Sequence, residues 1–331
     1  MKSRRPGLQD VANLVGVSKM TISRYLRNPN LVSEALQRKI KDALNHSGYI
    51  PNRAPEILSN AKSKAIGVLL PSLTNQVFAE VLRGIERVTD AYGYQTMIAH
   101  FGYSPEREEK RLTSLLSYNI DGLILTERTH TERSHQMLQI ADIPAVEIMD
   151  SVSPYLDMAV GFDNFEAARQ MTHKIINRGR KKIVYLSARQ DERSLIKQYG
   201  YEKAMKEAGL EPRSIATEEP SSYSLGAYLF QRALHRYPDT DGIFSTNDDL
   251  AIGAIFECQR IGIVVPDDIS IAGFHGHDVG QAMNPRLASV LTPREKMGEI
   301  AAKNLLTRLN GGKVTDKCID LSFTLLDGGS I

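Results

Sequence analysis

Apolar residues recur at helical spacing in three short runs within the first fifty residues. Positions three and four apart lie on one face of a helix, so each run predicts an amphipathic helix. Gly16 separates the first two runs, and Gly48 ends the third. Ser18 and Ser33 precede the second and third runs and are residue types that cap helix N-termini. The apolar positions are Leu8, Val11, Ala12, Val15, Ile22, Leu26, Leu36, Ile40, Ala43 and Leu44. Two helices joined by a Gly turn and supported by a third predict a helix-turn-helix.

From Ala65 onward, short apolar runs alternate with amphipathic runs, in two successive sets. Strands are expected at 65–71, 95–101, 122–126 and 145–149, and then at 159–163, 183–187, 242–246 and 270–274. Helices are expected at about 77–93, 106–118, 164–178, 196–208 and 248–260. Strands that are apolar throughout are typical of parallel sheets covered by helices on both faces. The pattern predicts an α/β protein, with an all-α helix-turn-helix head and a two-lobed, doubly wound parallel core.

A linker, residues 49–62, joins the head to this core. Pro51 and Pro55 prevent a long helix, although Pro55 suits the first turn of a short helix that would end near Asn60. A helix of this length is unstable alone and could form in contact with a partner. Leu58 is an apolar side chain in this polar linker. It either inserts between base steps of a DNA minor groove or packs on the core, and spacing alone favours neither.

The charge distribution separates the head from the core, although the 331-residue chain has a net charge of only +2. Residues 1–62 hold eleven Lys and Arg and four Asp and Glu, a net of +7. The remainder holds 41 − 11 = 30 bases and 39 − 4 = 35 acids, a net of −5. A compact basic unit favours a polyanion as the partner of the head. The alternative is a solvated basic arm, which the ordered apolar pattern disfavours.

The cysteine content and the N-terminus both point to a soluble cytosolic protein. Cys258 and Cys318 cannot form a disulfide framework and lack the spacing of a zinc site. The opening residues contain no apolar signal core, and no run of about 18 apolar residues follows. We therefore expect a cytoplasmic protein without a membrane anchor.

The second helix of the head points several polar side chains outward. In a helix-turn-helix, the second helix enters the major groove, and its early outward residues meet base edges. Arg24 can bind a guanine with two hydrogen bonds or bind a phosphate, and Met20 can contact a thymine methyl. Lys19 can bind either a guanine or a phosphate. The alternative is an amphipathic helix with a solvated face. The charge of the head makes DNA binding the preferred hypothesis.

Two stretches, LQDVANLVGVSKMTISRYL and GYIPNRAPEILSNAKSKAIGVLLP, resemble the lactose-repressor (LacI-type) family of bacterial transcription factors. The resemblance implies a hinge helix and a core of the periplasmic-sugar-binding-protein type, crossed three times by the chain. It implies a head at 1–48, a hinge at 49–62, a first lobe at 63–162 plus 292–321, and a second lobe at 163–291 plus 322–331. It places Leu58 at an intercalating position. Arg27 stands where the family often has Asn. The resemblance places Lys19, Met20 and Arg24 at base-reading positions. The candidate DNA-binding residues are Lys19, Met20, Thr21, Ser23, Arg24, Arg27, Arg53 and Leu58.

Polar residues that follow predicted strands are candidates for a small-molecule site, because ligands bind beyond the carboxyl ends of parallel strands. The resemblance puts Asp163, Arg193 and Asn247 at effector-contacting positions. Asp163 could instead cap the helix that follows, and Arg193 could form a salt bridge between the lobes. The candidates are Asn75, Phe78, Glu127, Asp163, Arg193, Lys197, Asn247 and His275.

The candidate ligand is a sugar acid. His275 stands where many members of the family have an acceptor Asp, and Arg193 and Lys197 could hold a carboxylate. The strings LPSLTNQVFAEVLRGIE, VGFDNFEAARQM and IAGFHGHD are similar to the gluconate-operon repressor branch. The resemblance implies gluconate as the effector, with idonate as the nearest alternative. It implies that the effector releases a homodimer from a palindromic operator. No other cofactor is expected.

Two other classes of function are weaker hypotheses. The chain lacks GxSxG, GxxxxGK[ST], GxGxxG and HExxH motifs, which disfavours an enzyme. His275, His277 and Asp278 could ligate a metal, but three ligands on one loop are weak evidence. A secreted sugar-binding protein conflicts with the basic head. The absence of a C-terminal heptad repeat favours a dimer over a tetramer.

Overall fold

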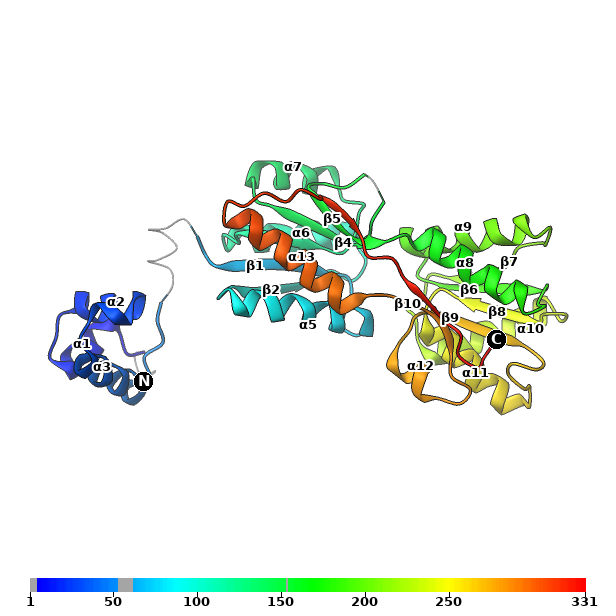
Figure 1. Cartoon of the computed structure of the whole chain (residues 1–331), viewed down its shortest axis with the longest axis horizontal. Coiled ribbons are helices and arrows are strands. Elements are labelled where there is room, and N and C mark those ends of the chain that lie inside the picture. Colours follow the sequence, from blue (N-terminus) through cyan, green and yellow to red (C-terminus); the bar gives the residue numbers. More distant parts are fainter. Residues whose placement is uncertain (1–4, 53–61, 153) are drawn as a thin grey trace. The chain divides into compact units, whose positions relative to one another are not determined.

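A computed structural model describes residues 5–52, 62–152 and 154–331. The chain divides into two compact units, a head that ends at Ser63 and a core that begins at Lys64 (Figure 1). Among the described residues, no helix has both the length and the apolar composition needed to cross a membrane. The combination of a helical head with parallel α/β sheets confirms the predicted fold class.

The head consists of α1 Leu8–Val15, α2 Lys19–Arg27, the 3-10 helix η1 Pro29–Leu31 and α3 Glu34–Ser47. The predicted apolar positions meet in one small cluster, in which Val11, Ala12, Ile22 and Ile40 are fully buried. Gly16 adopts a left-handed conformation with φ of 77° at the turn between α1 and α2. Each predicted helix of the helix-turn-helix is therefore present.

The predicted caps of the head differ in their outcome. Ser18 caps α2, because its hydroxyl oxygen accepts a hydrogen bond from the Thr21 backbone N–H at 3.2 Å. Ser33 occupies the N-cap position of α3 but makes no capping bond with its side chain. The prediction that Ser33 caps this helix is wrong in that respect.

The core contains two six-stranded sheets (Figure 1). Sheet A has the order β11-β5-β4-β3-β1-β2, and sheet B has the order β12-β10-β9-β8-β6-β7. The pairs are parallel except for β10 with β12. The strands of sheet A are β1 Ala65–Leu70, β2 Gln95–His100, β3 Gly122–Leu125, β4 Ala145–Asp150, β5 Met158–Phe162 and β11 Cys318–Asp320. Those of sheet B are β6 Ile183–Ala188, β7 Arg213–Thr217, β8 Gly242–Ser245, β9 Ser270–His275, β10 Ala288–Leu291 and β12 Thr324–Leu326.

Helices cover both faces of each sheet, because successive side chains of a strand point to opposite faces and the central strands bury apolar side chains on both. In β1, Val68 packs in the cluster with α5 and α13, whereas Leu69 packs in the cluster with α6 and α7. In β6, Tyr185 and Val184 divide in the same way between the clusters of α8 and α9 and of α10 and α11. The helices of the core are α5 Gln76–Ala91, α6 Pro105–Ser117, α7 Glu132–Ala141, α8 Asn164–Asn177, α9 Glu192–Glu207, α10 Tyr223–Arg236, α11 Asp248–Ile261, α12 Asp278–Ala282 and α13 Arg294–Leu309.

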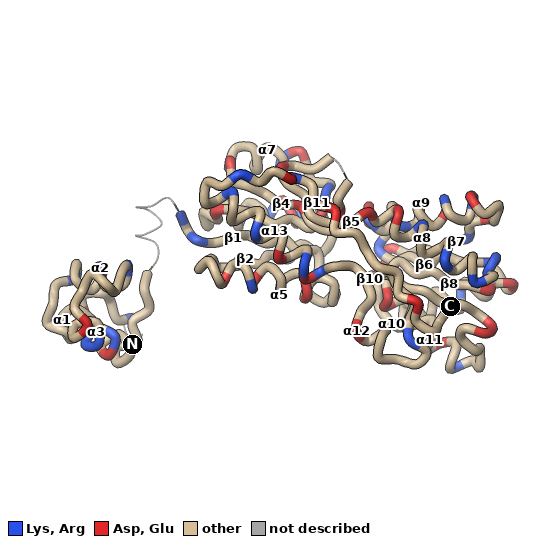
Figure 2. The backbone as a smooth tube through the Cα atoms, in the orientation of Figure 1, with Lys and Arg blue, Asp and Glu red and all other residues tan. Residues whose placement is uncertain are grey.

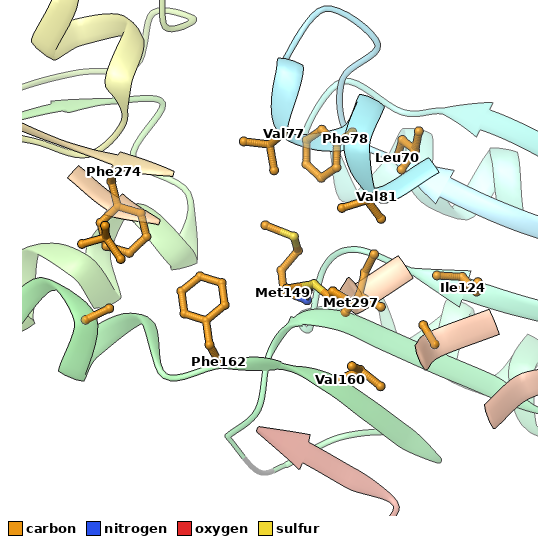
Figure 3. Packing of buried hydrophobic residues seen from close by; sticks show 14 of the residues in the cluster. Leu70, Val77, Phe78, Val81, Ile124, Met149, Val160, Phe162, Phe274 and Met297 are labelled. Carbon is orange, nitrogen blue, oxygen red and sulfur yellow. Dashed lines mark hydrogen bonds between the residues drawn. The ribbon is translucent and has the colours of Figure 1, made fainter. Parts of the chain in front are cut away.

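The chain passes between the two sheets at three places, after Phe162, after Leu291 and between Asp320 and Thr324. We call the part built on sheet A lobe 1 and the part built on sheet B lobe 2. The predicted lobe boundaries, near residues 162, 291 and 321, remain a prediction. The three crossings of the chain between the sheets support it. One apolar cluster continues through both lobes, where the rings of Phe162 and Phe274 lie 6.2 Å apart beside Met149 and Met297 (Figure 3).

The predicted start of one helix is wrong. Helix α9 begins at Glu192 and not near Ile196, because the Asp191 carboxylate accepts a hydrogen bond from the Ser194 backbone N–H at 2.8 Å. This correction matters for the site, since it moves Arg193 from a loop into the first turn of a helix. The prediction also missed α7, α10, α12, α13 and the strands β7, β10, β11 and β12.

Helices α5 and α13 approach each other closely enough that their backbones touch. A Cβ at Gly84 would lie 2.0 Å from the Glu295 carbonyl oxygen, and one at Gly298 would lie 2.1 Å from the Val81 carbonyl oxygen. Only glycine fits at these two positions, because real Cβ atoms do not approach an oxygen so closely. Arg87 pairs with Glu295 and Glu299 at the edge of the same contact.

We predict that Gly298→Ala lowers the free energy of unfolding by about 1–3 kcal/mol, because the added methyl forces the two helices apart. Urea unfolding measures this change. Lys303→Ala, at an exposed position of the same helix, is the control and should change stability by less than about 0.5 kcal/mol. Equal stability of Gly298→Ala and the control would contradict the close contact.

Candidate functional site

The outer face of α2 carries the predicted DNA-binding residues of the head. Lys19, Met20, Arg24 and Arg27 are exposed, and Met20 exposes 69% of its surface, a large fraction for an apolar side chain. Thr21 and Ser23 are half-buried. The Thr21 hydroxyl lies 2.9 Å from the Ser18 hydroxyl, and Ser23 accepts a hydrogen bond from Arg27 at 3.4 Å. Arg53 and Leu58 lie outside the described residues.

This face is cationic without a compensating acid. Helix α2 has the sequence KMTISRYLR and contains no Asp or Glu (Figure 2). The apolar side of the helix holds it in the head through Ile22, so its outer face is free to contact a polyanion. An exposed Met between cations is suited to a surface that meets both phosphates and base edges.

A narrow cavity in the core gathers residues from both lobes at the carboxyl ends of the two sheets. Positions that can hold the centre of a water molecule fill only about 30 Å³, so the lobes lie close together here. Of the predicted residues, Asn75, Phe78, Arg193, Lys197, Asn247 and His275 line it. Sequence reasoning missed other lining residues, namely Val77, Tyr103, Met149, Arg189, Asp191, Ser194 and Thr246. Tyr103 and Arg189 follow strands of the sheets, so the rule used for the other candidates could have found them.

Two of the predicted residues are not among the described residues that line this cavity. Asp163 caps α8, since its carboxylate accepts a hydrogen bond from the Glu166 backbone N–H at 2.9 Å. Glu127 lies behind Arg193 and contacts that guanidinium. Their contact with a ligand stays a prediction.

Arg193 connects the lobes. Its guanidinium donates to the Thr126 carbonyl oxygen and lies 3.4 Å from Glu127 and 3.6 Å from Asp150, all three on lobe 1. Burial opposes the charge of Arg193, but Glu127 and Asp150 outweigh it and raise the pKa of the guanidinium. Burial also raises the pKa of Glu127 to about 7, although Arg193 opposes this shift. The salt bridge between lobes, which the sequence left open, is therefore present.

Lys197 is the cation of the cavity that has no close carboxylate among the described residues. Its ammonium donates to the Thr246 carbonyl oxygen at 3.2 Å, lies 3.3 Å from His275 Nε2 and lies 3.9 Å from the centre of the Phe274 ring. Burial and the nearby Arg193 lower the pKa of Lys197 to about 7. A negatively charged group beside Lys197 would restore its charge.

His275 is held as a neutral ring in a strained backbone. Burial and the nearby Lys197 lower its pKa well below the usual value. Its backbone φ of 105° lies in a region that residues other than glycine rarely adopt. Backbone strain of this kind is found most often at functional sites. Its carbonyl oxygen accepts a hydrogen bond from Arg294.

The metal site considered for His275, His277 and Asp278 has no structural support. In residues 5–52, 62–152 and 154–331, no group of three His, Cys, Asp or Glu side chains is placed to hold a metal ion. Lys197 lies against His275, and burial, helped by Arg294 and Lys197, lowers the pKa of His277 to about 4. A cation would be repelled from this end of the cavity, whereas an anion would be attracted.

Known proteins resemble the chain along its whole length. A family model for bacterial regulatory proteins of the lacI family matches residues 7–52. A model for periplasmic binding proteins and the sugar binding domain of the LacI family matches residues 63–321. The HTH-type transcriptional regulator GntR of Escherichia coli strain K12 is 68% identical over 331 residues and covers 100% of both chains. The regulator IdnR of the same strain is 44% identical over 332 residues, with the same coverage.

Solved structures agree with this comparison. A LacI family transcriptional regulator from Silicibacter pomeroyi has a TM-score of 0.91 and 32% identity, covering 98% of this chain and 99% of its own. The transcription regulator GntR from Chromobacterium violaceum has a TM-score of 0.79 and 36% identity, covering 80% of this chain and 98% of its own.

The buried Lys197 predicts a pH dependence of stability. Between pH 7 and about 10.5, the unfolded chain binds a proton at Lys197 that the folded chain does not, so stability should rise with pH in this range. Lys197→Met should remove this contribution and flatten the difference between melting temperatures at pH 7.5 and 9.5. Lys203→Met, an exposed position on the same helix, should keep the wild-type difference. Identical profiles for the two variants would show that Lys197 is not desolvated.

Proposed function

The chain belongs to the LacI family of bacterial regulatory proteins, and from this membership we propose that it is a transcriptional repressor that a sugar acid, gluconate, releases from its operator. It is a DNA-binding regulator and not an enzyme, as its full-length relatives are transcriptional regulators. Binding to an operator requires access to chromosomal DNA, so we propose that the protein acts in the cytoplasm. The single observation that supports an acidic effector is the cationic cavity between the lobes.

We propose that α2 lies in the major groove. Arg24 and Lys19 would read guanines or hold phosphates, and Met20 would contact a thymine methyl. Two copies of the chain would pair through their cores, so that two heads address the two halves of a palindrome. Arg53 and Leu58 would add a phosphate contact and a minor-groove wedge.

We propose that gluconate binds between the lobes. Arg189, Arg193 and Lys197 surround this cavity. Asp191 pairs with Arg189, and carboxylates of lobe 1 neutralise Arg193, so Lys197 would be left to attract one anionic group. The hydroxyls of an acyclic sugar acid would face Asn75, Asn247 and the neutral His275. Phe78 would pack against its carbon chain. The similarity to the gluconate-operon branch supports gluconate, and the 44% identity to IdnR keeps idonate as the second candidate.

The proposed mechanism links the cavity to the hinge. The effector would rearrange the lobes and displace the two points at which the hinges join the cores of the dimer. The two heads would then bind the operator more weakly. A coupling free energy of about 1–3 kcal/mol would lower the affinity for the operator by a factor of about 5 to 150. Tighter operator binding on adding gluconate would reverse the sign of this coupling.

Arg24→Ala should relax base preference. Loss of a bidentate guanine contact costs about 1–3 kcal/mol at the matching base pair and little elsewhere. Affinity for an operator and for its single-base variants, measured by fluorescence anisotropy at fixed salt, tests this. Lys39→Ala, which removes one exposed charge from α3, should weaken binding to all duplexes equally. The same uniform loss for Arg24→Ala would reduce Arg24 to a phosphate contact.

Gluconate should raise the melting temperature of the full chain, because a ligand that binds only the folded state stabilises it by about 2.7 kcal/mol at 100 times Kd. A panel of gluconate, idonate, sugar phosphates and neutral sugars ranks the candidates. Lys197→Met should lose most of the shift, whereas Lys203→Met should retain it. No shift with any acid, or an equal shift with neutral sugars, would refute the proposed effector class.

A further inference from the structure

The salt bridge between Arg193 and lobe 1 has loose geometry. Tight contacts between a guanidinium and a carboxylate measure about 2.7–2.9 Å, whereas Arg193 lies 3.4 Å from Glu127 Oε2 and 3.6 Å from Asp150 Oδ2. Arg193 Nε and Glu127 Oε1 are buried and make no hydrogen bond within the part of the chain that the structure describes. The guanidinium is neutralised but incompletely bonded, so a better-placed anion would bind it more favourably.

Glu127 belongs to a short segment of lobe 1 that contacts α9 of lobe 2. Residue Thr129 of this segment donates a hydrogen bond to Glu192 in the first turn of α9, next to Arg193. Together with the Arg193 contacts to Thr126 and Glu127, this bond attaches lobe 1 to α9. We call residues 126–130 the bridging segment.

The far end of the bridging segment is fixed within lobe 1. The His130 ring lies 2.9 Å from Glu108 and 3.5 Å from Glu147, and all three side chains are almost fully buried. Burial opposes a charge on His130, but the two carboxylates outweigh it and raise its pKa to about 9. His130 is therefore a buried imidazolium between two carboxylates. The bridging segment can leave α9 while its other end stays in lobe 1.

We propose that Glu127 and Asp150 are internal counter-ions of Arg193 and that the carboxylate of the effector replaces them on the guanidinium. This proposal rests on the anionic effector proposed above. It gives Glu127 a different role from that of a ligand contact: Glu127 competes with the ligand for Arg193. A neutral sugar has no charge with which to replace a carboxylate, so the exchange selects for acids. It also removes contacts between the bridging segment and α9, which couples binding to movement of the lobes.

The two carboxylates can tolerate the exchange. Asp150 keeps a hydrogen bond from Asn164 Nδ2 at 3.0 Å. Glu127 already has a pKa raised to about 7 by burial, so it would take up a proton near neutral pH once Arg193 leaves it. Breaking a buried ion pair usually leaves a costly unpaired charge. Here the ligand compensates Arg193, and protonation compensates Glu127.

Isothermal titration of the full chain with gluconate tests the competition. Glu127→Gln removes one competing charge and should bind gluconate about five to twenty times more tightly than the wild type. Glu132→Gln, an exposed Glu of lobe 1, is the matched control and should bind like the wild type. Equal or weaker binding by Glu127→Gln would overturn the proposal, and weaker binding would make Glu127 a direct ligand contact.

A measurement without ligand keeps this test separate from the proposed effector. Spin labels at Tyr118 of lobe 1 and Lys206 of α9, both exposed, report the distance between the lobes in labelled chain diluted with unlabelled chain. A Cys318→Ser background removes the more accessible native thiol. Glu127→Gln should lengthen or broaden the distance distribution of the ligand-free chain, and Glu132→Gln should not.

Thr129→Val provides a second variant if Glu127→Gln does not fold, because Thr129 is exposed and its hydroxyl contacts Glu192. It should broaden the same distribution. An unchanged distribution in the variant that folds would overturn the role of the bridging segment. If the wild type binds no gluconate, the proposed effector is wrong, and the distance measurement alone decides whether these contacts hold the lobes together.

Discussion

A charge removed from water must meet an opposite charge or a set of hydrogen bonds, and the core of this protein is organised around that constraint. Both parallel sheets direct their carboxyl ends towards one cavity, so charged side chains from two lobes meet there out of contact with bulk water. Arg193 meets its requirement with groups of the opposite lobe. Arg294, only 3% exposed, combines a carboxylate of its own lobe, that of Glu80, with the His275 carbonyl oxygen of lobe 2. Neutralisation of the Arg193 guanidinium therefore depends on how the lobes are arranged, which makes that arrangement sensitive to a charged ligand.

The head meets a different requirement with very few residues. Its apolar cluster has four buried side chains, and every other position of α2 faces outward or only partly inward. Folding therefore fixes Ile22 but places little demand on Lys19, Met20 or Arg24. These outward positions can vary with the DNA sequence that is read, while the helix that presents them stays the same. Recognition and stability are in this way assigned to different residues of one short helix.

Local patterns were sufficient for the helices α1, α2 and α3 of the head and for most of the buried strands, although the buried strand β10 was missed. Continuous apolar runs such as 65–71 and 183–187 became central strands. A strand that is buried on both faces is apolar along its whole length, so it can be recognised in the sequence without knowing what packs against it. Helix α13 was missed because Gly298 and two alanines stand among its buried positions, and their packing depends on α5, which lies more than 200 residues away in the sequence. The cavity shows the same division. About half of its lining follows from the rule on strand ends, but the contacts of Arg193 with Thr126 and Asp150 depend on how the two lobes meet.

The glycine contact between α5 and α13 also limits how the core can move. Backbones in direct contact leave no side-chain layer that could slide, so the two helices should translate and rotate together. Helix α5 starts at the cavity, where Asn75 and Phe78 lie, and α13 starts where the chain returns from lobe 2. A displacement of the first turn of either helix would therefore move both helices, which have sixteen residues each. Lobe 1 should respond to its ligand as a stiff block whose displacement reaches the opposite end of both helices without being absorbed on the way.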